Sequence, residues 1–115
     1  MPGSNLFSGT LDLLILRSLV WGPLHGYGIG RWIRRTSSEI LSIEEGALYP
    51  ALHRMQKKGW LQSDWGLTET RRQAKFYSLT DLGREHLNQE TKRWEELATA
   101  VRSVLQGSRE AETSP

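Results

Sequence analysis

Cysteine is absent from the 115 residues of this sequence, and its absence excludes several kinds of chemistry. No disulfide, thiolate metal site or cysteine nucleophile can form. The three histidines, His25, His53 and His86, stand far apart, and none has a second ligand type at metal-binding spacing. We therefore expect neither a metal site nor a bound cofactor.

Long apolar runs are also missing. No stretch approaches the roughly 18 uninterrupted apolar residues of a membrane span. Residues 1–10 lack the basic and apolar regions of a signal peptide. We therefore expect a cytoplasmic protein without membrane contact, and a chain of this length fits one domain.

A strong excess of one charge is lacking as well, because the net charge is only +2. The distribution of charge along the chain is more informative than its total. Residues 31–77 contain nine Lys or Arg against five acids, whereas residues 81–115 contain five against seven. The middle of the chain is therefore basic, and its last third is acidic.

Two helices are predicted in the first third of the chain. Residues 1–9 show no periodicity and are expected to form a flexible arm. A helix capped by Thr10 should follow and end at Gly22-Pro23, and a second helix should cover residues 27–37. His25, just before that second helix, is expected to be a turn or capping residue.

A third helix is predicted to end at Gly59, and its beginning has two interpretations. Ser42 and Glu45 have the spacing of a capping box, and Glu44 is an equally suitable cap position. Gly59 follows two lysines, and a glycine after cations is a typical end of a helix. Pro50 lies inside the predicted helix, so a slight bend or a late beginning is expected.

The third helix has two different sides. Leu48, Leu52 and Met55 fall on one side and should face the core. The other side is rich in hydrogen-bond donors that can meet phosphates and base edges. Its candidate DNA-binding residues are Tyr49, Pro50, His53, Arg54 and Lys57. Such a face is most simply a solvated surface, but the basic hairpin that follows favours DNA binding.

Two short alternating segments, residues 60–65 and 75–79, predict a β-hairpin with a long loop. Arg71, Arg72 and Lys75 lie within five residues of one another at this loop. A cluster of that kind can follow a phosphate backbone or place an arginine in a minor groove. Alone it would be a solvated loop, but beside the third helix it predicts a basic wing.

A final helix, residues 80–106, begins at Thr80 and carries an apolar stripe. The candidate dimerisation residues in this stripe are Leu87, Trp94, Leu97, Val101 and Leu105. The stripe is too long for the small domain to cover, so we expect a homodimer. Residues 107–115 are polar and are expected to be disordered.

The order of these elements predicts a fold that is mainly α-helical with a small β-hairpin. Residues 10–79 would form a winged helix-turn-helix, and residues 80–106 would form a long C-terminal dimerisation helix. In such a dimer the two third helices would lie about one DNA turn apart, roughly 34 Å. Double-stranded DNA is therefore the expected partner.

Two other functions compete with DNA binding. An enzyme would need a nucleophile with a base, paired carboxylates or a phosphate-binding loop. The glycines of residues 25–30 follow a helix rather than a strand, so we expect no enzyme and no catalytic residue. The alternative is a winged-helix module that binds proteins and not DNA, because a fold does not determine a function.

Several short motifs occur in a specific order along residues 9–105. They are Gly9-Thr10-Leu11, Ile15-Leu16, Gly22-Pro23-Leu24-His25-Gly26-Tyr27, Gly46-Ala47-Leu48-Tyr49-Pro50-Ala51-Leu52, Lys58-Gly59-Trp60-Leu61, Phe76-Tyr77-Ser78-Leu79-Thr80 and Gly83-Arg84. With these motifs in this order, the chain resembles the PadR family of bacterial transcriptional regulators, in particular its compact members. The resemblance implies a homodimeric repressor that binds a pseudo-palindromic operator through the third helix and the wing.

The resemblance has two further consequences. The family commonly has a small hydroxyl residue where Ala47 stands and a serine cap where Glu44 stands, so Ala47 cannot supply a phosphate contact. The resemblance to drug-binding relatives is compatible with a small aromatic effector stacked on Trp94. Trp94 is otherwise plain core, which is the simpler interpretation, and the other tryptophans are expected to be packing residues.

Overall fold

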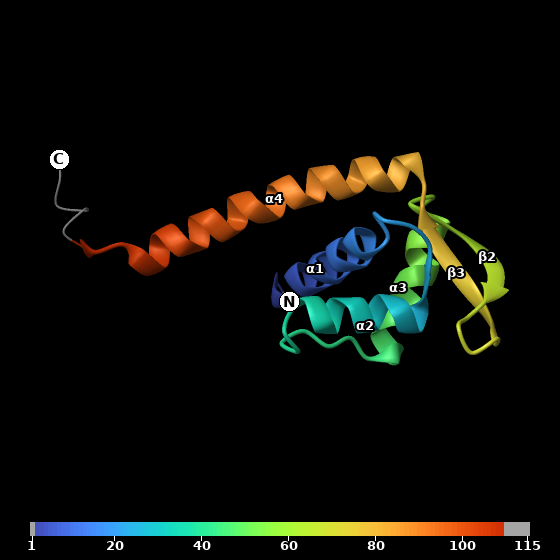
Figure 1. Ribbon diagram of the computed structural model, residues 1–115. Helices are drawn as coiled ribbons and strands as arrows, with labels where there is room; N and C mark the ends of the chain where they lie inside the picture. The colour runs from blue at the N-terminus through green and yellow to red at the C-terminus, as the bar shows by residue number, and fades with distance from the viewer. Residues whose placement is uncertain (1, 110–115) are drawn as a thin grey trace.

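The computed structural model consists of three helices gathered beside a small sheet, with a fourth helix that extends away from them (Figure 1). It describes the backbone of residues 2–109 and the side chains of residues 9–109. In chain order the elements are α1 (Pro2–Ser18), β1 (Leu24–His25), α2 (Gly26–Thr36), α3 (Glu45–Lys57), β2 (Leu61–Leu67), β3 (Gln73–Leu79) and α4 (Asp81–Gln106). The predicted winged helix-turn-helix with a long C-terminal helix is confirmed.

The core lies where α1, α2 and α3 meet the sheet. Its buried side chains are Ile15, Leu16, Leu19, Ile29, Ile33, Leu48, Ala51, Leu52, Met55, Leu61, Tyr77 and Leu87. The predicted inner side of α3, Leu48, Leu52 and Met55, is buried. Since these three face inward, the opposite side of α3 is left at the surface.

α1 begins at Pro2, nine residues before Leu11, the first helical residue after the predicted cap. Residues 2–9 continue α1 toward the N-terminus instead of forming a separate arm, so Thr10 lies inside the helix and does not cap it. Proline is tolerated at a first helical position because its missing N–H would have no partner there. The glycines and the absence of apolar periodicity hide this first part of the helix in the sequence.

The beginnings of α2 and α3 are set by the residues that precede them. His25 caps α2, because its Nδ1 accepts a hydrogen bond from the Gly28 N–H at 3.0 Å. Glu44 occupies the N-cap of α3 without a side-chain hydrogen bond, so the Ser42 and Glu45 capping box is not formed. α3 ends at Lys57, and Gly59 has a φ of 80°, as expected for a glycine that closes a helix.

The sheet has three antiparallel strands in the order β1-β3-β2. β2 pairs with β3 from Leu61↔Leu79 to Leu67↔Gln73, so the strands are longer and the loop, residues 68–72, shorter than predicted. The Thr68 hydroxyl and carbonyl accept hydrogen bonds from the N–H groups of Arg72 and Arg71, which closes the turn within five residues. The two-residue β1 is too short to leave an alternating pattern.

The first turns of α4 are fastened to the end of the α3–β2 connection. Thr80 caps α4 by accepting from the Gly83 N–H, and its own N–H donates to the Trp60 carbonyl. A Cβ at Gly83 would overlap that same carbonyl. The Trp60 indole stacks on His86, with ring centroids 3.8 Å apart. These contacts set the direction of α4 relative to the domain.

Leu87, a member of the predicted dimerisation stripe, is buried inside its own domain. It is only 3% exposed and packs in the core of its own domain, because the first two turns of α4 still lie against α1 and the sheet. The later part of α4 extends away (Figure 1). The prediction for residues 107–115 falls mainly on residues 110–115, which lie outside the described residues.

Membrane insertion has no support in residues 2–109. No helix in that range is both long enough and apolar enough to span a bilayer.

Candidate nucleic-acid interface

The outer side of α3 carries four of the five residues that the sequence singles out there. Tyr49, Pro50, His53 and Lys57 are all exposed. Pro50 stands inside α3, which nevertheless begins at Glu45 and ends at Lys57. The phenol, imidazole and ammonium of this side can donate hydrogen bonds outward, as a helix that enters a major groove requires.

Arg54 differs from these four because it is half-buried and bound to an acidic residue of α1. Its Nη1 and Nη2 donate to the two carboxylate oxygens of Asp12 at 2.7 and 2.8 Å. Hydrogen bonding to Asp12 raises the pKa of the Arg54 guanidinium above its ordinary value. The pair joins α3 to α1, and the DNA contact predicted for Arg54 stays a prediction, because its guanidinium already binds Asp12.

The wing presents the three predicted cations at the surface. Arg71, Arg72 and Lys75 are exposed, and within residues 9–109 none of them is in an ion pair. Arg71 has a φ of 62°, which places it at the turn of the loop. The Lys75 ammonium lies 5.9 Å from the centre of the Trp65 ring, and Trp65 is 69% exposed. Trp65 is therefore a surface residue of the wing and not the packing residue that the sequence suggests.

Tyr49 connects α3 to the first turn of α2. A Cβ at Gly26 would lie 2.6 Å from the Tyr49 hydroxyl oxygen, so only glycine leaves room for this ring. Burial raises the pKa of the neighbouring Tyr77 phenol, and the proximity of Tyr49 adds to the effect. The two phenols and Gly26 thus fix where the N-terminal end of α3 sits against α2 and β3.

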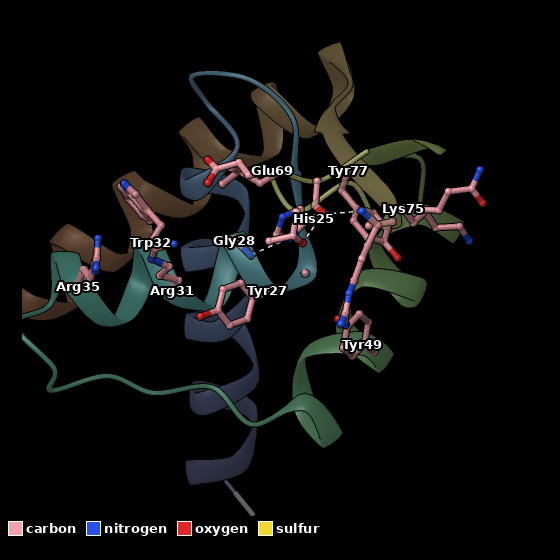
Figure 2. Close-up of a pocket in the computed structure, with 17 residues that line it drawn as sticks. His25, Tyr27, Gly28, Arg31, Trp32, Arg35, Tyr49, Glu69, Lys75 and Tyr77 are labelled. Atoms are coloured by element: carbon pink, nitrogen blue, oxygen red, sulfur yellow. Dashed lines mark hydrogen bonds between the residues drawn. The ribbon is translucent and has the colours of Figure 1, made fainter. Parts of the chain in front are cut away.

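A groove of about 800 Å³ lies between α2 and the wing. We call it the wing groove, and it is lined by β1, one side of α2, Tyr49 of α3, and wing residues 68–70 and 72–75, with Tyr77 (Figure 2). Arg31 and Arg35 belong to its α2 wall, and Arg72 and Lys75 belong to its wing wall. Sequence reasoning missed Arg31 and Arg35, because the helical pattern shows them only as a solvated face of α2.

The side chains at this surface do not form a catalytic or metal-binding group. Within the part of the chain that the structure describes, no three His, Cys, Asp or Glu residues come together to hold a metal ion. The wing groove has His25 and Glu69 among its lining residues, but His25 already uses Nδ1 to cap α2. What the surface offers instead is hydrogen-bond donors and cations.

The remainder of the predicted stripe on α4 is exposed. Trp94, Leu97 and Val101 are 47%, 41% and 49% exposed, and Leu105 is 80% exposed. Val104 is exposed to the same extent as Leu105. An apolar surface of this length on one helix is the kind that a partner covers.

Comparison with known proteins places this chain among transcriptional regulators. The family model described as the transcriptional regulator PadR-like family matches residues 15–89. The chain is 28% identical over 78 residues to the negative transcriptional regulator PadR of Bacillus subtilis, covering 68% of this chain and 43% of that protein. It therefore spans less than half of that relative.

Solved structures give the same result over nearly the whole chain. A transcriptional regulator from Clostridium thermocellum is similar with a TM-score of 0.77 and 30% identity, covering 86% of this chain and 96% of that one. A PadR-like transcriptional regulator from Bacillus cereus is similar with a TM-score of 0.76 and 27% identity, covering 90% and 99%.

Proposed function

Since this chain belongs to the PadR-like family of transcriptional regulators, we propose that it is a homodimeric repressor that binds a pseudo-palindromic operator through α3 and the wing. The observation that carries the proposal is the exposed donor side of α3, Tyr49, Pro50, His53 and Lys57, next to the unpaired cations of the wing. The helix would read base edges, and the wing would hold phosphates. Such a regulator would act in the cytoplasm.

The dimer rests on α4. Trp94, Leu97, Val101 and Leu105 lie on one long helix that extends away from the domain, and each is exposed among the described residues. A second copy with the same stripe covers it by twofold symmetry, and the same symmetry matches the two halves of an operator.

Fluorescence anisotropy with a labelled duplex from upstream of the protein's own gene, compared with a scrambled duplex, tests the proposal. Tyr49→Phe and His53→Ala should weaken operator binding more than binding to the scrambled duplex, by roughly 1–3 kcal/mol for lost base contacts. Arg71→Ala and Lys75→Ala should weaken both and flatten the salt dependence.

Equal losses on both duplexes for all four variants would contradict this division of roles. A wild-type protein that shows no salt-sensitive binding to any genomic fragment would instead support the protein-interaction module.

Trp94 is our candidate for the contact with a small aromatic effector, because its indole is 47% exposed at the stripe where two copies would meet. Candidate aromatic compounds should quench tryptophan fluorescence of the wild type and of Trp21→Phe, in which another exposed indole is removed. They should not quench the fluorescence of Trp94→Phe. If Trp94→Phe is quenched as strongly as the wild type, Trp94 does not belong to the effector site.

A further inference from the structure

We propose that the wing groove holds one strand of the DNA backbone, with Arg31 and Arg35 of α2 contacting its phosphates from one wall and Arg72 and Lys75 from the other. This inference rests on the proposed DNA binding and extends it to α2, a helix that the sequence presents only as solvated. In this arrangement α2 and the wing contact the same DNA strand from opposite walls of the wing groove.

The cations are placed on facing walls. Arg31 and Arg35 are four residues apart on α2, so they share one side of the helix and are separated by about 6 Å along its axis. That spacing lets the two guanidinium groups reach different phosphates. Figure 2 shows Arg31 and Arg35 along α2 on one side of the wing groove and Lys75 on the other side.

All four cations are available for a ligand. Within residues 9–109, none of Arg31, Arg35, Arg72 and Lys75 forms an ion pair with a carboxylate. Glu69 is the one acid among the described residues that line the wing groove. A groove with four unpaired cations and one carboxylate attracts a polyanion.

The floor of the wing groove fits a sugar-phosphate strand. Tyr27 and Trp32 present aromatic surfaces to it, and the ring of His25 lies between them and the wing. Since His25 Nδ1 accepts from the Gly28 N–H, the neutral ring has its proton on Nε2, from which it can donate to a phosphate oxygen. Apolar faces for sugars and outward donors for phosphates thus occur together.

Continuity with the α3 surface favours a DNA strand over a small anion. Tyr49 belongs both to the outer side of α3 and to the lining of the wing groove, and Arg72 belongs both to the wing loop and to this lining. A strand that runs between the major groove, occupied by α3, and the groove reached by the wing would pass through this space.

Arg34 is a matched control on the same helix. Its Nε lies 3.2 Å from the Glu39 carboxylate, and it lines a smaller cavity near Glu45 instead of the wing groove. Arg34→Ala removes the same charge from the same exposed helix as Arg31→Ala or Arg35→Ala does. Any difference between them therefore reports position and not net charge.

The experiment measures the affinity of wild type, Arg31→Ala, Arg35→Ala, Arg31→Ala/Arg35→Ala and Arg34→Ala for operator and scrambled duplexes over a series of salt concentrations. Each single variant is compared with Arg34→Ala at equal net charge and should lower the slope of log K against log salt by about 0.9. The double variant should lower the slope of log K against log salt by about 2, since each lost phosphate contact is worth about 0.9. Its affinity should fall on both duplexes, whereas Arg34→Ala should keep the wild-type slope. Circular dichroism should show the same helix content and melting transition for the wild type and every variant.

Duplexes with uncharged methylphosphonate linkages beside each half-site give a second readout. They should lower the slope of the wild type and leave that of Arg31→Ala/Arg35→Ala nearly unchanged, because the same contacts are already missing. The inference is overturned if the wild type binds the operator and the double variant keeps the slope of Arg34→Ala. A wild type that binds no duplex overturns the proposed function itself, and the two failures are therefore distinct.

Discussion

At the scale of single residues, the paired hydrogen bonds between Arg54 and Asp12 hold α3 against α1. Asp12 is only 14% exposed and its two oxygens receive both ends of the guanidinium group. A bidentate pair of this kind is more specific in geometry than an ordinary surface ion pair. It therefore orients α3 against α1 at a partly buried position.

We predict that Arg54→Ala and Asp12→Ala each lower the free energy of unfolding by about 1 kcal/mol, a modest value because Arg54 is partly solvated. The double variant should lose less than the sum, because both changes break one interaction. Chemical denaturation of the four proteins measures this coupling. Arg54→Ala should keep the wild-type salt slope for DNA, and a drop of about 1 would mean that the guanidinium leaves Asp12 to hold a phosphate.

The raised pKa of Tyr77 leads us to predict that the stability of the protein depends on pH. Its phenol is buried in the sheet, and burial raises its pKa above the ordinary value of 10.0. A group whose pKa is raised on folding stabilises the protein below the unfolded pKa and loses that contribution as pH rises through the folded pKa. Stability should therefore fall above pH 10, and Tyr77→Phe should fall less steeply in thermal melts at pH 9–11. Equal slopes for both proteins would exclude Tyr77 as the cause.

At the scale of elements, the junction between the end of α3 and the beginning of α4 decides the shape of the domain. The Trp60 carbonyl accepts the Thr80 N–H, and Gly83 packs against the same carbonyl. His86 stacks on the Trp60 ring, and the Lys58 ammonium lies 4.8 Å from the centre of the same ring. α4 therefore begins at a fixed position relative to the last turn of α3.

Gly83→Ala should destabilise the protein by roughly 1–3 kcal/mol, because its methyl group would overlap the Trp60 carbonyl and the first turn of α4 would have to move. Gly30→Ala is the control, since a Cβ at that helical position meets nothing within 4 Å. It should stabilise the protein by about 0.4–1 kcal/mol. Thermal melts of both variants measure the contrast, and a Gly83→Ala protein as stable as Gly30→Ala would contradict the packing at this junction.

Elements were predictable from the sequence to different extents. The cap at Thr80 and the glycine at position 59 act within a few residues. The beginning of α4 and the end of α3 therefore follow from the local sequence pattern. The early beginning of α1 at Pro2 leaves no apolar periodicity in the sequence. β1 exists only because Leu24 and His25 pair with Tyr77 and Phe76. Pairing across such a separation cannot be read from a two-residue segment.

At the scale of the whole molecule, the long axis belongs to α4. The protein measures 66 × 29 × 28 Å, and α4 accounts for its elongation (Figure 1). In its C-terminal half, Val101 and Leu105 are 49% and 80% exposed among the described residues. A single copy is therefore an incomplete unit in terms of apolar burial.

Val101→Glu should convert the dimer into a monomer, because a charge would be placed in the apolar stripe between two copies. Thr99→Glu changes the charge equally but lies on the opposite side of α4, so it should remain a dimer. Light scattering after size exclusion gives both masses, and the operator affinity of Val101→Glu should fall with its loss of the second half-site contact. A wild type with a monomeric mass at micromolar concentration would contradict the dimer.

The sequence by itself determined the order of the helices and the hairpin, the apolar side of α3 and the cap of α4 at Thr80. Each of these depends on residues within one or two turns, where periodicity and backbone chemistry act directly. Only the tertiary structure decided which polar and apolar residues meet. Asp12 and Arg54 are 42 positions apart, Leu87 packs in the core of its own domain, and Arg31 and Arg35 of α2 line one groove together with the wing. Such contacts depend on how the packed elements are oriented, and no local pattern records that orientation.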